Sequence, residues 1–336
     1  MSTISQQANI PNCILTQLSF PAAAMFSNSF EQLYKNSEIS SFLDVGLWEL
    51  ETHTSFTSIS ITAINSIAND ARIAVSQTNK WALAINAATP NFFIRSTDGG
   101  NTWASVSLPV TPASPGWSLV AFGDGIWLMV RGDTGAFYTS PSSNAGSWTL
   151  NGYAFPDAGI MRAANFRDNV WVAISSLGDI ARSTNGTTWS TANSSIFTVG
   201  RDVEFSFITD DWMAIGTAGG AQRAAISTDL GLTWTLTSGS IPNAVTINTV
   251  EYHNNSWFIG GVASSGVGLW RSIDDGVTWT QLTSTGFPAS GQIQSLHEIG
   301  EFRDMLIAMS ITDGNIYFSK DGLSWFTYQL GPWEFN

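Results

Sequence analysis

Tryptophan is the residue whose number and spacing could support chemistry in this chain. Fifteen tryptophans occur among 336 residues, and amphipathic aromatic rings favour binding interfaces, including surfaces that stack on sugars. Seven of them end, or are expected to end, a short repeated phrase: Trp48, Trp103, Trp148, Trp189, Trp234, Trp279 and Trp325. Five more open a predicted second strand of a repeat: Trp81, Trp127, Trp171, Trp212 and Trp257. Only Trp117, Trp270 and Trp333 lie outside both sets, so these three are the candidates for stacking on a glycan.

The other reactive side chains do not form a recognised catalytic or metal-binding pattern. The histidines His53, His253 and His297 lack the spacing of zinc ligands. Asp274 and Asp275 are adjacent, but the alternating oxygen ligands and closing glutamate of a calcium loop are missing. The sequence also has no phosphate-binding glycine loop, Ser–His–Asp order or dinucleotide fingerprint. We therefore predict no catalytic residue, no metal site and no cofactor.

The repeated phrase sets the organisation of the chain. It reads "STDGGNTW" at Ser96, "STDLGLTW" at Ser227 and "SIDDGVTW" at Ser272, and a shorter copy, "SKDGLSW", begins at Ser319. The tryptophans from Trp103 to Trp325 follow one another at intervals of 45, 41, 45, 45 and 46 residues. A period of this length is typical of repeat architectures, in which each repeat is one supersecondary unit.

Each repeat is expected to hold four short strands. The copy "INTVEYHNNSWFIGGVASSGVGLWRSIDDGVTWTQL" alternates apolar, β-branched and aromatic runs with Gly, Asn and Asp. Dipeptides such as Asp-Gly in "FGDGIW" and Asn-Asn in "YHNNSW" suit tight hairpins, which need positive φ angles. Four strands in about 45 residues predict an all-β fold, a β-propeller of four-stranded antiparallel blades.

The phrase S-x-D-x-G-x-T-W resembles the Asp-box, or BNR repeat, of sialidase-like β-propellers. The residues that carry the resemblance are Asp98, Gly100 and Trp103; Trp148; Asn185 and Trp189; Asp229, Gly231 and Trp234; Asp274, Gly276 and Trp279; and Asp321, Gly322 and Trp325. The first, fourth and fifth of these copies match in full, whereas Trp148 ends a copy that keeps little more than its serines. The resemblance covers about residues 62 to 336. It implies that the boxes are structural and lie at the blade periphery, away from any active-site mouth.

The number of blades depends on the N-terminal segment. "SFLDVGLWELET" contains Asp44, Gly46 and Trp48, which favours a seventh blade over six blades with an N-terminal arm. The preceding residues lack the paired strand pattern, so the arm stays as the alternative. We divide the chain into residues 1–60, an arm or divergent first blade, and residues 61–336, the propeller.

The sialidase resemblance raises the question of hydrolysis, which in that family uses three arginines, a tyrosine nucleophile and acidic residues. Arg95, Arg182 and Arg271 each precede a box serine, so repeat symmetry places them on different blades, where we expect them to bridge neighbours. Glu251 and Tyr252 are adjacent on a predicted strand and should face opposite sides. The family's N-terminal Arg-Ile-Pro element has no counterpart, and nothing marks three of the remaining arginines as a set. We therefore expect a protein that is not an enzyme.

Composition narrows the choice of partners. The chain has 26 acidic and 13 basic residues, a formal charge of −13, which disfavours nucleic acid and anionic membrane surfaces. The single cysteine, Cys13, excludes an intrachain disulfide. No basic n-region with an apolar h-region opens the chain, and no run of about 18 apolar residues predicts insertion into a membrane.

A surface rich in Ser, Thr, Asn and Gly without an export signal is consistent with a bacteriophage structural protein, assembled in the host cytoplasm and located in the virion. Asp-box propellers of this kind are similar to modules of tailed-phage virions, in the tail, in a fibre or as capsid decoration. We expect residues 1–60 to dock on other virion proteins and the propeller to face outward, with a host cell-surface glycan as candidate ligand. The alternatives are an exo-sialidase-like glycoside hydrolase and a cellular assembly-factor propeller. The sequence does not determine the oligomeric state.

Overall fold

The computed structural model describes residues 71–75, 82–86, 93–97, 104–105, 117–141, 147–283, 286–287, 290–299, 305–310, 312 and 315–328. These residues form 24 strands in six four-stranded antiparallel sheets, each made of four consecutive strands. Among them there is no helix long and apolar enough to cross a membrane. The predicted all-β architecture of four-stranded blades is confirmed.

We number the six sheets as blades 1 to 6 in chain order. The strands of blades 1 to 3 are β1 (Ala71–Val75), β2 (Ala82–Asn86), β3 (Phe93–Ser96), β4 (Ala104–Ser105), β5 (Trp117–Gly123), β6 (Ile126–Arg131), β7 (Phe137–Ser140), β8 (Thr149–Leu150), β9 (Met161–Arg167), β10 (Val170–Ser175), β11 (Ile180–Ser183) and β12 (Trp189–Asn193). The strands of blades 4 to 6 are β13 (Val199–Phe205), β14 (Trp212–Ala218), β15 (Ala221–Ser227), β16 (Thr235–Ser240), β17 (Ala244–His253), β18 (Ser256–Ala263), β19 (Leu269–Ser272), β20 (Thr280–Gln281), β21 (Ile293–Ile299), β22 (Met305–Ser310), β23 (Ile316–Ser319) and β24 (Phe326–Tyr328).

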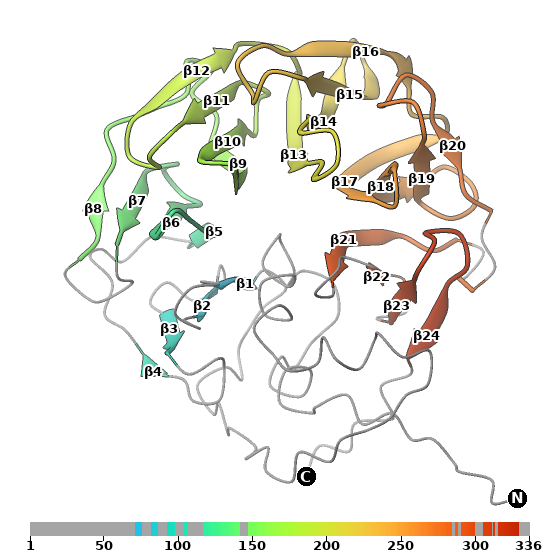
Figure 1. Ribbon diagram of the computed structural model, residues 1–336, viewed down its shortest axis with the longest axis horizontal. Helices are drawn as coiled ribbons and strands as arrows, with labels where there is room; N and C mark the ends of the chain where they lie inside the picture. The colour runs from blue at the N-terminus through green and yellow to red at the C-terminus, as the bar shows by residue number, and fades with distance from the viewer. Residues whose placement is uncertain are drawn as a thin grey trace, which may run out of the picture.

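The blades are arranged radially, in the order of the chain (Figure 1). The first strand of every blade lies nearest the centre, and the fourth lies at the rim. Contacts between inner strands run from β1 to β5, β9, β13, β17 and β21 in turn. The described blades therefore form part of a β-propeller, with inner strands of neighbouring blades side by side around its axis.

The hairpins between first and second strands have the predicted turn chemistry. Asp168 and Asn169 have φ angles of 46° and 60°, and Asn254 and Asn255 have φ angles of 47° and 56°. Positive φ at both central residues is the requirement of a two-residue hairpin whose twist matches the strands. Asn and Asp adopt this region at lower cost than other residues that carry a side chain.

The hydrophobic core lies between blades rather than within one sheet. One cluster joins Val172 and Ile174 of β10 to Val203 and Phe205 of β13, and equivalent clusters join blades 2 and 3, 4 and 5, and 5 and 6. The tryptophans that open second strands, Trp127, Trp171, Trp212 and Trp257, are at most 1% exposed. Their predicted role as core residues is confirmed, except that Trp81 lies outside the described residues.

The predictions for the N-terminal segment are not tested. Residues 1–70, which include Asp44, Gly46 and Trp48, lie outside the described residues. The boundary at residue 60 and the choice between a seventh blade and an arm therefore stay predictions.

Candidate functional site on the inner strands

The repeated phrase forms a hydrogen-bonded turn between the third and fourth strands of a blade. In blade 4, Asp229 Oδ1 accepts hydrogen bonds from the backbone N–H groups of Leu232 and Thr233, at 3.0 and 2.8 Å. Ser227 Oγ donates to Asp229 Oδ1 at 2.8 Å and accepts from the N–H of Gly231 at 2.9 Å. The indole N–H of Trp234 donates to the Gly231 carbonyl at 3.2 Å. The phrase thus closes its own hairpin.

The same bonds recur in three other blades. Asp274 and Asp321 accept from the backbone of Thr278 and Ser324, at 2.8 and 2.7 Å, and Asn185 accepts from Thr188 at 2.7 Å. The tryptophans at the end of the phrase, Trp189, Trp234, Trp279 and Trp325, each donate to the carbonyl of the turn glycine. The predicted structural use of Asn185, Trp189, Asp229, Gly231, Trp234, Asp274, Gly276, Trp279, Asp321, Gly322 and Trp325 is therefore seen in the geometry.

Of the remaining residues of the phrase, only Trp148 lies within the described residues. Trp148 is buried, at 7% exposure, whereas Asp98, Gly100 and Trp103 lie outside the described residues. The turn glycines also touch the preceding blade: a Cβ on Gly231 would lie 2.7 Å from Val172, and one on Gly322 would lie 2.1 Å from the ring of Phe258. The phrase is used for folding and for packing between blades.

For one of the three tryptophans, Trp270, the prediction of glycan stacking is wrong. Trp270 is 0% exposed, and its indole N–H donates to the Pro242 carbonyl at 2.8 Å. Its ring packs with Trp257 and Trp279 in the core between blades 4 and 5, so no face is left for a sugar. Trp117 begins β5, but its side chain is outside the described part of the structure, as is the whole of Trp333. Both stay predictions.

The three arginines before the box serines do not converge. They lie on β3, β11 and β19 of three different blades, as repeat symmetry predicts. Arg182 Nε donates to the Leu230 carbonyl of the next blade at 2.8 Å, which confirms its predicted bridging role. For Arg271 that prediction is wrong, because its Nε donates to Ser256 Oγ of its own blade at 2.9 Å.

The acidic residues of the described inner strands are the side chains that sequence reasoning did not group. Asp202, Glu204, Glu251 and Glu298 are 7%, 5%, 2% and 4% exposed. Glu204 accepts two hydrogen bonds, at 2.9 and 2.8 Å, from the Asn165 amide of the preceding blade. A buried carboxylate is costly unless hydrogen bonds or charges compensate it, and here a neighbouring blade supplies them.

Asp202 joins blades 4 and 5 through a hydrogen bond, and an equivalent hydrogen bond joins blades 5 and 6. Its Oδ2 accepts the backbone N–H of Val250 at 3.1 Å, and Thr249 Oγ1 accepts the N–H of Leu296 in blade 6 at 3.4 Å. Burial raises the pKa of Asp202 to about 6, although hydrogen bonds from Val250, Val203 and Thr249, and the positive charge of Arg162, lower it. The inner strands are thus linked by side chains that accept backbone N–H groups.

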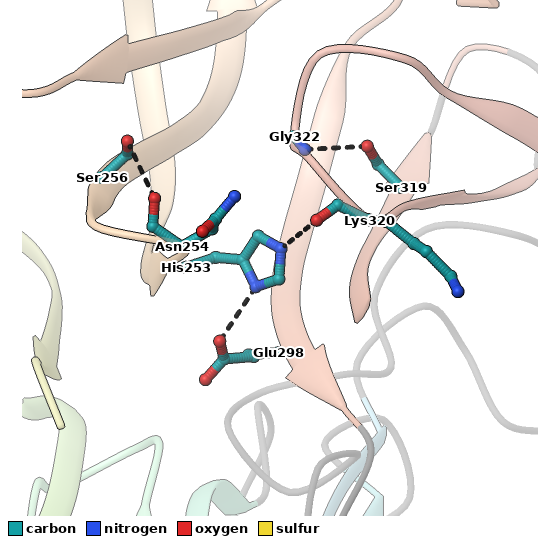
Figure 2. Close-up of polar contacts among 7 residues, drawn as sticks. All are labelled: His253, Asn254, Ser256, Glu298, Ser319, Lys320 and Gly322. Carbon is teal, nitrogen blue, oxygen red and sulfur yellow. Dashed lines mark hydrogen bonds and ion pairs between the residues drawn. The ribbon is translucent and has the colours of Figure 1, made fainter. Parts of the chain in front are cut away.

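His253 joins blades 5 and 6 (Figure 2). Its Nδ1 lies 2.9 Å from Glu298 Oε1, and its Nε2 lies 2.9 Å from the carbonyl oxygen of Lys320 in the repeated turn of blade 6. A carbonyl oxygen only accepts, so Nε2 carries a proton. Because Nδ1 faces a carboxylate, a second proton lies between His253 and Glu298, on one or the other.

A β-bulge interrupts five of the inner strands. The register shifts leave one residue unpaired in each of β5, β9, β13 and β21, and two residues unpaired in β17. One bulge residue in each of these strands carries a polar side chain: Ser118, Arg162, Arg201, Asn248 and Gln294. The second bulge residue of β17 is Val245. Arg162 and Arg201 thus occupy one repeat position on adjacent inner strands. Bulges are frequent next to binding sites, where they redirect a side chain.

In chemical terms, the described inner strands offer buried acceptors and, at the equivalent bulge positions of β9 and β13, the arginines Arg162 and Arg201. In the described residues, no three His, Cys, Asp or Glu side chains are placed to hold a metal ion. The arginine pair, rather than the acids, is the group that has chemistry to offer a ligand.

Comparison with known proteins gives the fold. No protein-family model and no curated protein matches the sequence. Among solved structures, YCF48 from Cyanidioschyzon merolae is similar with a TM-score of 0.55 and 16% identity, over 77% of this chain and 84% of its own. A virginiamycin B lyase from Staphylococcus aureus gives 0.59 and 12% identity, over 77% and 83% of the two chains. This chain has their propeller fold.

These neighbours do not share one function. An ancestral GH74 enzyme is also similar, with a TM-score of 0.57 and 14% identity, over 77% of this chain and 38% of that one. A second structure of YCF48 is described as bound to D1 peptide. At such low identity the likeness concerns the fold alone, because propellers support many unrelated functions.

Proposed function

We propose that this chain is a non-enzymatic structural protein of a bacteriophage virion. Residues 1–60 dock it on capsid or tail proteins, and the Asp-box propeller faces outward, where a host cell-surface glycan is its candidate ligand. The observation that carries the non-enzymatic part is the burial of Asp202, Glu204, Glu251 and Glu298, the carboxylates of the described inner strands.

A hydrolase needs carboxyl groups that reach the substrate, because they transfer protons or attack the reacting carbon. Glu204 instead accepts from Asn165 of one neighbouring blade, Asp202 from Val250 of the other, and Glu298 contacts His253. Carboxylates that form such contacts hold neighbouring blades together. A rigid module suits the outer surface of a particle.

The composition supports the virion part of the proposal. Charged residues form only 12% of the chain, the formal charge is −13, and the polar surface is rich in Ser, Thr, Asn and Gly. An acidic surface disfavours adhesion to nucleic acid during assembly. We also propose that the phrase at Asp44, Gly46 and Trp48 belongs to a seventh blade.

The proposal is tested on particles. Mass spectrometry of gradient-purified particles from a producing culture should detect this chain in a constant ratio to the major capsid protein. A genomic deletion of residues 1–60 should yield particles without it, whereas Arg131→Gln in the propeller should leave incorporation unchanged. Particles that lack the wild-type chain, or that retain the truncated one, would overturn the proposal. The truncated chain should be compared by circular dichroism, since loss of fold points to a seventh blade.

An exo-sialidase-like hydrolase is the second candidate, and the adjacent arginines Arg162 and Arg201 are the observation that favours it. A fluorogenic sialoside decides between the two functions. Turnover by the purified chain that disappears in Arg201→Gln would replace the non-enzymatic proposal.

A further inference from the structure

Arg162 and Arg201 stand out because, among the described residues, neither arginine forms an ion pair with an acid. Within the described part of the chain neither side chain donates a hydrogen bond, unlike Arg131, whose guanidinium contacts Asp133 at 2.9 and 2.6 Å. Arg201 is partly buried, and its Nε is buried without any hydrogen-bond partner. Such a group costs free energy, and native proteins rarely leave one unsatisfied.

The two guanidinium groups also act on each other. Burial and the positive charge of Arg162 lower the pKa of Arg201. The inner strands that carry them, β9 and β13, are in contact, and both residues are the bulge residues of their strands. Two like charges are therefore held together near the axis of a chain whose formal charge is −13.

Asp202, an acid on which the charge of Arg162 acts, does not pair with either arginine. Arg162 is close enough to lower the pKa of Asp202, yet the two side chains form no ion pair, and the Asp202 carboxylate accepts from Val203 and Val250 instead. Asn248, the bulge residue at the equivalent position of the next blade, donates its amide to the Ile293 carbonyl at 2.9 Å. The donors of Arg162 and Arg201 thus have no acceptor among the described residues.

We propose that Arg162 and Arg201 form an oxyanion-binding site on the inner strands, which takes a phosphate, sulfate or carboxylate group of an acidic glycan. A guanidinium presents five N–H donors in a planar fork that fits such a group with two parallel bonds. Arg162 is exposed, so the ligand reaches the pair from solvent, and the buried Nε of Arg201 provides the inner donor. The glycan source rests on the proposed function, whereas the oxyanion chemistry does not.

Inorganic phosphate and sulfate are the first probes, measured by isothermal titration calorimetry on the full chain, with sodium chloride at matched ionic strength as the control. We expect one saturable site in the wild type. Arg162→Gln or Arg201→Gln should weaken it by at least about tenfold, and Arg201→Lys by less than Arg201→Gln. Arg131→Gln, which removes an arginine already paired with Asp133, should leave the affinity unchanged.

Thermal unfolding provides a second readout that does not depend on ligand affinity. In buffer without phosphate, Arg162→Gln should unfold at the wild-type temperature or higher, because it removes a like charge from Arg201. Phosphate should raise the unfolding temperature of the wild type and of Arg131→Gln to the same extent, and that of Arg162→Gln and Arg201→Gln by less. No saturable binding by the wild type, or equal binding by wild type and the Arg201→Gln variant, would overturn the proposal. So would equal losses in the Arg131 variant.

The glycan source is tested with particles. Virions that carry the Arg162 and Arg201 variants should keep the chain but adsorb less to host cells. Phosphate binding by a chain that is missing from particles would refute the proposed function and leave the site intact. Normal incorporation into particles by a chain that does not bind phosphate would refute the site and leave the proposed function intact.

Discussion

His253 and Glu298 form a buried contact between blades 5 and 6, with Nδ1 and Oε1 2.9 Å apart. Their side chains are 1% and 6% exposed, and the other imidazole nitrogen, Nε2, donates a hydrogen bond to the Lys320 carbonyl. At this contact the repeated turn of blade 6, which contains Lys320, lies against His253 on the inner strand of blade 5 (Figure 2). Polar contacts of this kind, and not only apolar packing, determine how neighbouring blades fit.

Removal of His253 should therefore be costly. His253→Ala removes the imidazole from the buried Glu298 carboxylate and from the Lys320 carbonyl, so we expect a loss of about 3–5 kcal/mol in the free energy of unfolding. Glu298→Gln should lose less, because a neutral imidazole can accept from the amide while Nε2 still donates to Lys320. Urea unfolding of both variants measures the difference. Equal losses would show that the contact is not a hydrogen-bonded pair.

Asp202 should make stability depend on pH. Its folded pKa of about 6 lies above the value of 3.8 for a free carboxyl group, so the folded chain binds more protons between these values. The contribution of Asp202 to the free energy of unfolding therefore falls as pH rises from about 4 to about 6, by no more than about 3 kcal/mol, and is constant above that. Urea midpoints of wild type and Asp202→Asn across this range isolate the effect. A parallel course of the two curves would contradict it.

Asp229 should behave in the opposite way. Burial raises its pKa, but the bonds from Thr233, Ser227 and Leu232 outweigh burial, and the pKa lies below its ordinary value. A carboxylate of this kind stabilises the fold above its unfolded pKa, and the contribution is lost as pH falls through the folded pKa. We expect Asp229→Ala to cost about 1–3 kcal/mol at pH 7. Asp229→Asn should cost less, because Asn185 makes the equivalent bonds in blade 3. If the two variants lost the same free energy of unfolding, the negative charge of Asp229 would matter more than its ability to accept hydrogen bonds.

Two glycines separate backbone strain from packing between blades. Gly125 and Gly322 have φ angles of 72° and 70°, but a Cβ on Gly125 meets nothing within 4 Å, whereas one on Gly322 would lie 2.1 Å from Phe258. Gly125→Ala should cost about 1–2 kcal/mol from strain alone. Gly322→Ala should cost about 1–3 kcal/mol more, because the turn must move away from blade 5. Thermal or urea unfolding compares them, and equal costs would mean that the turn does not press on the neighbouring blade.

The sequence by itself determined the blade and its repeated turn. Ser227, Asp229, Gly231 and Trp234 bond to one another within eight residues, and such local geometry requires particular residue types at particular spacings. That is why the phrase could be recognised, why its period predicted four-stranded blades, and why the arginines before it could be assigned to different blades.

Only the tertiary structure decided which inner-strand residues meet. The partners Asn165 and Glu204 are 39 residues apart, His253 and Glu298 are 45 apart, and Asp202 and Val250 are 48 apart. These separations vary because they include loops of different length, while the blades still bring the strands side by side. For the same reason the burial of Trp270 in the core between blades 4 and 5 follows from the packing of blades. Arg162 and Arg201 share a repeat position, but only the contact between β9 and β13 shows that their charges act on each other.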